Sequence, residues 1–320
     1  MRVFVTGASG FIGSAVCQAL LSRGHHVIGL ARSEASAQAL AEAGIEPFLG
    51  SLEDIDGLKR AAASADAVIH LAFVHDFSDF KKTTNVHNYD LAFDSMVDAH
   101  KACVIDAYAI EAIGDALVGS NKILIGTSGT LMLGLGKLDP ERPSTELDTT
   151  NPEIEFPRKS EPAVLAYASR GVRAMVIRLP MTVHGKGDKN GFVAHVVRQA
   201  KANNVSLFVG EGKNRWAAVH RLDAAKLYVL AMEKGQPGAV YHAVHDQGVA
   251  IKDIAKVIGQ GLCIPVESKW SDKDISTHFT FLSRFMTLDC LASAELTKKW
   301  LGWEPTHCTL LEDLKQGVYF

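Results

Sequence analysis

The chain opens with the stretch MRVFVTGASGFIG, residues 1–13, in which a β-branched and apolar run meets three glycines. Gly7, Gly10 and Gly13 are spaced GxxGxxG, and a helical pattern of apolar residues begins at Phe11. The order of strand, glycine turn and helix predicts a turn that binds phosphate, with N–H groups at the helix N-terminus facing the ligand. Gly7 permits the tight turn, Gly10 leaves room for a pyrophosphate, and Gly13 lets the helix pack closely on the strand. We expect a nucleotide cofactor here; the competing interpretation is a glycine turn without a ligand.

The end of the second expected strand, residues 26–30, indicates which dinucleotide is preferred. An NAD site usually carries Asp or Glu there to hold the ribose 2′-hydroxyl. This chain instead has Arg32 and Ser33, and a guanidinium beside a hydroxyl suits a 2′-phosphate. Glu34 disagrees, but it falls where the next helix should begin and suits its first turn. We expect NADP(H), with NAD(H) less favoured; a purely solvated Arg32 is the alternative.

Composition limits the classes of function. The chain has 320 residues, 47% hydrophobic residues, 22% charged residues and a formal net charge of -3, as in an ordinary globular protein. This charge does not indicate a nucleic-acid partner. No apolar run approaches membrane-spanning length, the first strand starts at residue 2, and we expect a cytoplasmic protein. No metal site is expected, because the histidines form no HExxH motif and the cysteines form no CxxC pair, lying at Cys17, Cys103, Cys263, Cys290 and Cys308.

Strand and helix patterns alternate through the first 180 residues. Such alternation predicts an α/β fold, a Rossmann-like doubly wound parallel sheet whose ligands lie at the carboxyl ends of the strands. Residues 1–180 are expected to form the NADP-binding domain, and residues 181–320 a smaller C-terminal α+β substrate lobe. Further strands are expected at 46–49, 67–72, 122–125, 174–177 and 240–244, the last returning to the sheet. A helix is expected at 58–63, and a long helical stretch, as one helix or two, at about 86–118.

Taken together, these motifs resemble those of the extended short-chain dehydrogenase/reductases, also called the NAD-dependent epimerase/dehydratase family. The resemblance covers nearly the whole chain. It rests on residues 6–13, 50–52, 68–72, 127–130, 178–180, 219–225 and 301–305.

The resemblance adds expected cofactor contacts to those of the glycine turn. Ser51 and Leu52 would lie beside the adenine, and Thr127 and Ser128 near the nicotinamide. The complete expected set is Gly7, Ser9, Gly10, Phe11, Ile12, Gly13, Arg32, Ser33, Ser51, Leu52, Leu71, Ala72, Phe73, Thr127, Ser128, Pro180 and Thr182.

The chain departs from this family at the usual Tyr-x-x-x-Lys pair, in which the phenol exchanges a proton with the substrate. A glutamate usually follows the lysine by four residues. If Glu161 is that glutamate, Pro157 stands in place of the lysine and Glu153 in place of the tyrosine. Tyr167 lies about a turn and a half beyond Glu161 and is not expected to replace the acid. We therefore predict an atypical subgroup that lacks the pair.

Other residues would then complete the reaction. Ser128 and Thr130 are placed to orient a carbonyl, and Lys159, with Arg158, to supply positive charge; we predict Ser128, Thr130 and Lys159 as catalytic. Alternatively, these hydroxyls only finish a strand and these charges are solvated. His184 is not expected to be an acid. Two segments, 188–192 and 212–216, are candidate substrate loops, with Arg215 at a position where sugar-nucleotide relatives hold a phosphate and Trp216 equally suited to packing.

Three functions remain open at this point. One is an NADP(H)-dependent oxidoreductase that transfers a hydride to or from a small carbonyl or alcohol, with a proton donor other than tyrosine. Another is an epimerase, dehydratase or isomerase that uses bound dinucleotide. The third is a non-catalytic protein that senses NADP(H). Expected partners are a small-molecule substrate and, at most, a second copy of the chain, as a monomer or homodimer, with no nucleic acid and no membrane.

Overall fold

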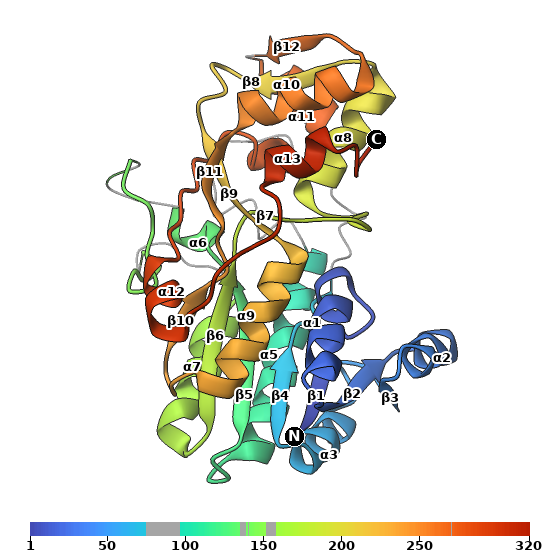
Figure 1. Cartoon of the computed structure of the whole chain (residues 1–320), viewed down its shortest axis with the longest axis vertical. Helices are drawn as coiled ribbons and strands as arrows, with labels where there is room; N and C mark the ends of the chain where they lie inside the picture. Colours follow the sequence, from blue (N-terminus) through green and yellow to red (C-terminus); the bar gives the residue numbers. More distant parts are fainter. Residues whose placement is uncertain (75–96, 135–138, 140, 152–157, 270) are drawn as a thin grey trace.

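The computed structural model describes the chain except residues 75–96, 135–138, 140, 152–157 and 270. Two lobes follow each other along the long axis of the molecule (Figure 1). The lobe that contains the N-terminus holds a seven-stranded sheet, and the other lobe holds shorter strands and most of the C-terminal helices.

The large sheet is parallel throughout. Its strand order runs outward in both directions from β1, as in a doubly wound fold, and this confirms the predicted Rossmann-like architecture. The order is β10 (Val240–His242), β6 (Arg173–Leu179), β5 (Ile123–Gly129), β4 (Ala67–His70), β1 (Arg2–Thr6), β2 (His26–Ala31) and β3 (Glu46–Leu49).

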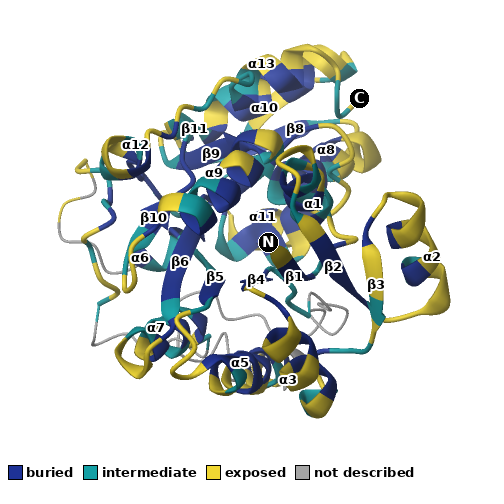
Figure 2. Cartoon of the chain, turned by 60° about the horizontal axis from the view of Figure 1, so that its bottom comes forward, coloured by how far each residue is buried: buried dark blue, intermediate teal, exposed yellow. Residues whose placement is uncertain are grey.

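Helices cover both faces of this sheet (Figure 2). Val3 and Val5 point into one core and Phe4 into the other, and all three are fully buried. Burial on both faces explains why the strands read as continuous apolar runs. One face carries α1 (Phe11–Ser22), α2 (Glu34–Glu42) and α9 (Arg221–Lys234); the other carries α3 (Ile55–Ser64), α5 (Val97–Leu117) and α7 (Ser160–Leu165).

Several strands differ in length from the predicted ranges: β6 spans Arg173–Leu179 against the predicted 174–177, and the central strands β5 and β4 also differ. β5 continues to Gly129 because its last residues still pair with β6, although their side chains are not apolar. β4 ends at His70, after which the N–H of Leu71 is shared between the carbonyl and the hydroxyl of Thr6 and the N–H of Ala72 turns to that hydroxyl. The first part of the predicted helix 86–118, residues 86–96, lies outside the described residues.

The second lobe has its own core, which includes Trp216 and Phe279. It contains a three-stranded sheet in the order β11 (Asp246–Ala250), β9 (Arg215–His220), β7 (Thr182–His184), and a two-stranded sheet of β12 (Val266–Lys269) and β8 (Ser206–Val209). Its helices are α8 (Phe192–Asn203), α10 (Ile251–Leu262), α11 (Asp272–Phe279) and α13 (Leu310–Lys315).

The two lobes interleave along the chain. β10 returns to the large sheet beside β6, at the position predicted for residues 240–244. Helix α9 also belongs to the first lobe, because it packs along α1 (Figure 1). Two short helices, α6 (Leu131–Gly134) and α12 (Glu295–Leu301), follow β5 and flank β10, respectively.

Candidate functional site

The candidate site lies along the carboxyl edge of the parallel sheet. All strands of this sheet end at the same edge, and the strand order reverses between β1 and β4. In doubly wound folds, ligands bind in the crevice outside such a reversal. The glycine turn and most of the predicted contacts lie on the loops that leave this edge.

The glycine turn has the geometry that a pyrophosphate requires. Gly7 has a φ of 72°, and the N–H of Gly10 donates to the carbonyl of Gly7 at 2.9 Å. A Cβ on Gly13 would lie 2.0 Å from the carbonyl oxygen of Gly7, so only glycine fits there. Gly10 is the N-cap of α1 and offers no side-chain cap, which leaves the first N–H groups of the helix for a ligand. Ser9 is exposed beside them, and Phe11 and Ile12 are half-buried.

Thr6 connects the glycine turn to the end of β4. Its Oγ1 accepts the N–H groups of Leu71 at 3.2 Å and Ala72 at 3.1 Å. A Cβ on Gly7 would lie 2.9 Å from the nitrogen of Ala72, so the two loops are in close contact. Leu71, Ala72 and Phe73 are half-buried at this edge, as expected of residues that face a ligand.

The residues predicted for the adenosine half follow β2 and β3. Arg32 is exposed and makes no ion pair within the described part of the chain. The Ser33 hydroxyl caps α2 and accepts the N–H of Ser36 at 3.2 Å, so it already has a structural role. Ser51 is half-buried, its hydroxyl accepts the N–H of Glu53, and Leu52 is buried under the sheet edge.

A chain of buried hydrogen bonds runs beneath the site. Thr6 Oγ1 lies 2.9 Å from His70 Nδ1, and His70 Nε2 lies 3.2 Å from Asp106 Oδ1. Because Thr6 Oγ1 already accepts two N–H groups, its proton is directed to Nδ1, and His70 donates to Asp106 from Nε2. The hydroxyl of Ser160 donates to the other oxygen of Asp106. These hydrogen bonds therefore hold β1, β4, α5 and α7 together.

Arg158 contacts Ser160, the last residue in this series of hydrogen bonds. Its Nε donates to Ser160 Oγ at 2.8 Å, and its Nη2 donates to the carbonyl of Thr127 at 3.3 Å. Its guanidinium lies 4.1 Å from the centre of the Phe73 ring, between the ends of β4 and β5. Burial acts to raise the pKa of Asp106, but hydrogen bonds from His70 and Ser160 and the charge of Arg158 outweigh it and lower that pKa. The roles of His70 and Asp106 are not predicted from the sequence, although the position of His70 in the motif at 68–72 is a signal for the first of them.

The predicted catalytic residues lie in different environments. Ser128 is half-buried at the end of β5, and its hydroxyl has no hydrogen-bond partner among the described residues. Thr130 is buried, and its Oγ1 also lacks a partner there. Lys159 is exposed at the N-cap of α7, adjacent to Arg158. Of these three residues, Ser128 therefore combines an unpaired hydroxyl with access from the sheet edge.

The remaining residues predicted near the nicotinamide differ in whether their side chains already form hydrogen bonds. Thr127 Oγ1 donates to the carbonyl of His70 at 2.8 Å and accepts from the hydroxyl of Tyr228 at 2.9 Å, so it holds β4, β5 and α9 together. Pro180 is buried. Thr182 is also buried, and its Oγ1 has no partner among the described residues.

The segment expected to replace the usual tyrosine and lysine is described only in part. Glu153 and Pro157 lie outside the described residues. Glu161 pairs with Arg178, whose Nε donates to Oε2 at 2.8 Å, and so serves packing between α7 and β6. Tyr167 donates to the carboxylate of Asp115 at 3.0 Å and lies against α5, away from the end of β5. Its burial, with the nearby charge of Asp115, raises the pKa of Tyr167 to about 12.

Arg215 and Trp216 in the predicted substrate loop 212–216 have structural contacts. Arg215 pairs with Asp289 at 2.7 Å and with Glu141 at 3.0 Å, and hydrogen bonds to these carboxylates raise its pKa. Trp216 is fully buried and packs against Phe192, the last residue of the other predicted loop, 188–192.

A cluster of possible metal donors lies in the second lobe. One donor atom from each of His220, Cys308 and Asp313 lies within 4.8 Å of the others. Two of these residues already have hydrogen-bond partners. His220 Nδ1 accepts the N–H of Leu222 at 3.3 Å, and Asp313 Oδ2 pairs with His184 Nδ1 at 2.8 Å. The ring of His184 thus orients Asp313. This contact differs from that of a catalytic acid, which would face a substrate at the edge of the large sheet.

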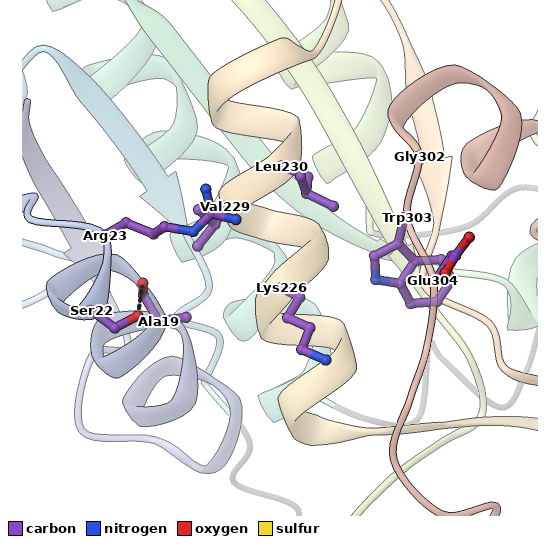
Figure 3. A pocket seen from close by; sticks show the side chains of 9 residues that line it. All are labelled: Ala19, Ser22, Arg23, Lys226, Val229, Leu230, Gly302, Trp303 and Glu304. Carbon is purple, nitrogen blue, oxygen red and sulfur yellow. Dashed lines mark hydrogen bonds between the residues drawn. The ribbon is translucent and has the colours of Figure 1, made fainter.

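A surface pocket lies elsewhere on the molecule (Figure 3). It is formed by the C-terminal half of α1, the middle of α9 and the segment at Trp303. The glycine turn is at the opposite end of α1, and no predicted site residue lines this pocket. Its lining is Ala19, Ser22, Arg23, Lys226, Val229, Leu230, Gly302, Trp303 and Glu304.

The chain matches known sequences over most of its length. A family model described as "NAD dependent epimerase/dehydratase family" matches residues 3–244. An uncharacterized protein of Schizosaccharomyces pombe is 47% identical over the full length of both chains. The sterol-4-alpha-carboxylate 3-dehydrogenase (decarboxylating) of Dictyostelium discoideum is 29% identical over 78% of this chain and 72% of its own.

Solved structures show the same fold at low sequence identity. A dTDP-glucose 4,6-dehydratase from Streptomyces venezuelae superposes with a TM-score of 0.74 at 19% identity, over 99% of this chain and 96% of that one. The UDP-glucose 4-epimerase of Thermotoga maritima gives 0.73 at 20% identity, over 99% and 97%. Separately, none of the helices described here has the length and apolar character to cross a membrane.

Proposed function

Because the chain belongs to the NAD-dependent epimerase/dehydratase family, we propose that it is an NADP(H)-dependent oxidoreductase acting on a small carbonyl or alcohol. The observation that carries this proposal is the unpaired hydroxyl of Ser128 at the end of β5, with the guanidinium of Arg158 bound to the carbonyl of the preceding residue. A dehydrogenase and a ketoreductase among the relatives, at 29% and 26% identity, also favour oxidoreductase chemistry.

The family supports a nicotinamide dinucleotide as cofactor, which would supply or accept the hydride. The N-terminus of α1 would hold the pyrophosphate, because its first N–H groups have no side-chain cap. Arg32, exposed and without an ion pair among described residues, favours NADP(H), since a guanidinium can bind the 2′-phosphate in a bidentate manner. Glu34 in the first turn of α2 opposes this preference, because its carboxylate would repel a 2′-phosphate.

Ser128 would orient the oxygen of the substrate by donating a hydrogen bond to it. A fixed donor to an oxygen that gains negative charge stabilises the transition state more than the ground state. Thr130 is the second candidate, although its burial limits its access. The proton itself would come from water or from a cationic neighbour, because Tyr167 is held by Asp115.

Arg158 would supply the positive charge at this end of the site. It is held by Ser160, Thr127 and the ring of Phe73, so its guanidinium is already in place before any ligand binds. Lys159 remains a predicted alternative, as an exposed cation adjacent to Arg158. We also propose a cytoplasmic protein that acts alone or as a homodimer on a small molecule.

The test is NADPH oxidation with a panel of small aldehydes and ketones. The Ser128→Ala/Thr130→Val double variant should lose about 10²-fold in rate while NADPH affinity stays within a few-fold. Ser64→Ala, a loss of one hydroxyl on α3, serves as the control. Unchanged turnover in the double variant would mean that neither hydroxyl orients the substrate oxygen, and would leave that role to Lys159 or a bound water. Equal losses of rate and affinity would mean that these hydroxyls only hold the cofactor.

An epimerase or dehydratase is the second candidate. The UDP-glucose 4-epimerase of Corynebacterium glutamicum is 20% identical over 98% of this chain, which favours it. Such an enzyme would convert its substrate without net consumption of NADPH. Cofactor binding without any conversion would instead indicate an NADP(H)-sensing protein.

A further inference from the structure

Arg221, the first residue of α9, lies beside the first turn of α1. Its Nη2 lies 3.2 Å from Ser14 Oγ, and its guanidinium lies 4.7 Å from the centre of the Phe11 ring. Its Nη1 donates to the carbonyl of Lys186 at 3.1 Å, in the loop that follows β7. This side chain therefore joins three segments at the N-terminal end of α1.

Within the described part of the chain, no carboxylate neutralises the charge of Arg221. Its side chain is half-buried, and no carboxylate of the described residues pairs with it, whereas Arg178 pairs with one carboxylate and Arg215 with two. A guanidinium has five N–H donors, and only two hydrogen bonds from Arg221 are formed with described residues. Burial without a partner lowers its pKa. An unpaired and partly desolvated cation is costly unless an anion binds nearby.

We propose that Arg221 binds the pyrophosphate of the dinucleotide together with the N-terminus of α1, an inference that rests on the proposed cofactor. Phe11 and Ser14, which fix the guanidinium, belong to the same helical turn whose N–H groups would hold the phosphates. The helix supplies partial positive charge, and Arg221 adds a full charge beside it. Since Arg221 also holds the loop at Lys186, the second lobe would contribute to binding through this contact.

Calorimetric titration with ADP and with adenosine tests this assignment without any enzyme activity. Arg221→Gln should weaken ADP binding about tenfold or more, because it removes a charge-assisted contact to phosphate, and should leave adenosine affinity within twofold. Arg221→Lys keeps the charge but loses the planar fork of donors. Its ADP affinity should therefore lie between that of the parent protein and that of the Arg221→Gln variant. Arg198→Gln is the matched control, since Arg198 is exposed on α8 and donates to the carbonyl of Lys189 in the adjoining loop, without contact to α1.

Three results would overturn the inference. One is an Arg221→Gln protein with unchanged ADP affinity, and another is an equal loss for ADP and adenosine at an unchanged melting temperature. If Arg221→Gln fails to fold, an Arg221→Lys protein that binds ADP as tightly as the parent overturns it as well. A parent protein that binds no ADP, NADPH or NADH would reject the proposed cofactor itself, which separates the two failures.

Discussion

The guanidinium of Arg158 lies over the ring of Phe73, 4.1 Å from its centre, and joins the ends of two neighbouring strands. Phe73 follows β4, and Arg158 precedes α7, which packs on β5. This pair sits above the buried chain from Thr6 to Ser160. A positive charge is thereby fixed on the nicotinamide side of the proposed site by contacts that need no ligand.

Replacing Arg158 and Lys159 one at a time should show which of the two supplies the positive charge for turnover and NADPH binding. Arg158→Leu should reduce turnover about 10²-fold and also weaken NADPH binding, because a fixed charge near the reacting oxygen is lost. Lys159→Leu, on an exposed side chain, should change each quantity less than threefold. Steady-state kinetics and calorimetry on both variants give the comparison; the reverse order would assign the charge to Lys159.

Cofactor preference should depend on Arg32. Arg32→Asp should lower NADPH affinity at least about tenfold and leave NADH affinity equal or higher, since a carboxylate repels a 2′-phosphate but accepts a 2′-hydroxyl. Arg60→Asp on the exposed side of α3 makes the same change of charge away from the site. Titration of both cofactors would refute the role of Arg32 if the ratio of their affinities stayed constant.

Two glycines of the turn should respond differently to substitution. Gly10→Val should abolish dinucleotide binding with little change in stability, because Gly10 is exposed at the ligand side of the helix cap. Gly13→Ala should lower the free energy of unfolding by about 1–3 kcal/mol, since its Cβ would lie 2.0 Å from the carbonyl of Gly7. Urea unfolding and cofactor titration on both proteins test this division of roles.

Tyr167 should prove structural. Its hydroxyl is committed to Asp115 and to the carbonyl of Glu111 at 3.1 Å. Tyr167→Phe should therefore keep turnover within a few-fold of the parent and lower the free energy of unfolding by about 1 kcal/mol. A loss of a hundredfold in turnover, as expected for removal of a general acid, would contradict this assignment.

Stability should fall in mild acid because of His220. Burial, together with the neighbouring His184 and His307, lowers the pKa of His220 to about 4. As the pH falls, the unfolded chain therefore binds a proton at this residue before the folded chain does. The contribution of His220 to the free energy of unfolding is fully present above pH 6.5 and is lost as the pH falls toward 4. The loss from this residue is at most about 3 kcal/mol.

His220→Asn tests this dependence while keeping a side chain that can cap α9. Its free energy of unfolding in urea should fall less between pH 7.5 and 4.5 than that of the parent. The control is His26→Asn, which removes an exposed histidine. An equal decline in all three proteins would assign the acid sensitivity to other groups.

The sequence predicts the glycine turn and the sheet well because both depend on local patterns. Gly7 and Gly13 are required by backbone geometry within one turn of chain, and the strands are apolar because both faces are covered. The contacts of Arg158, by contrast, depend on Asp106 and His70, which are 36 residues apart in the chain and meet only through the packing of α5 on the sheet. Arg215 is similar: its partner Asp289 lies 74 residues away, and nothing in the local pattern identifies it.

The return of β10 to the large sheet has a consequence for motion between the lobes. The chain passes from one lobe to the other between β6 and β7, between β9 and α9, and between β10 and β11. It returns to the first lobe at α12, which packs on β10 and α9, and passes back to the second lobe before α13. A swing about a single linker would have to strain the other passages. Any closing of the second lobe over the sheet edge is thus limited to a small rotation shared by these covalent connections, and a fragment ending at residue 180 would lack both the helix beside α1 and the strand beside β6.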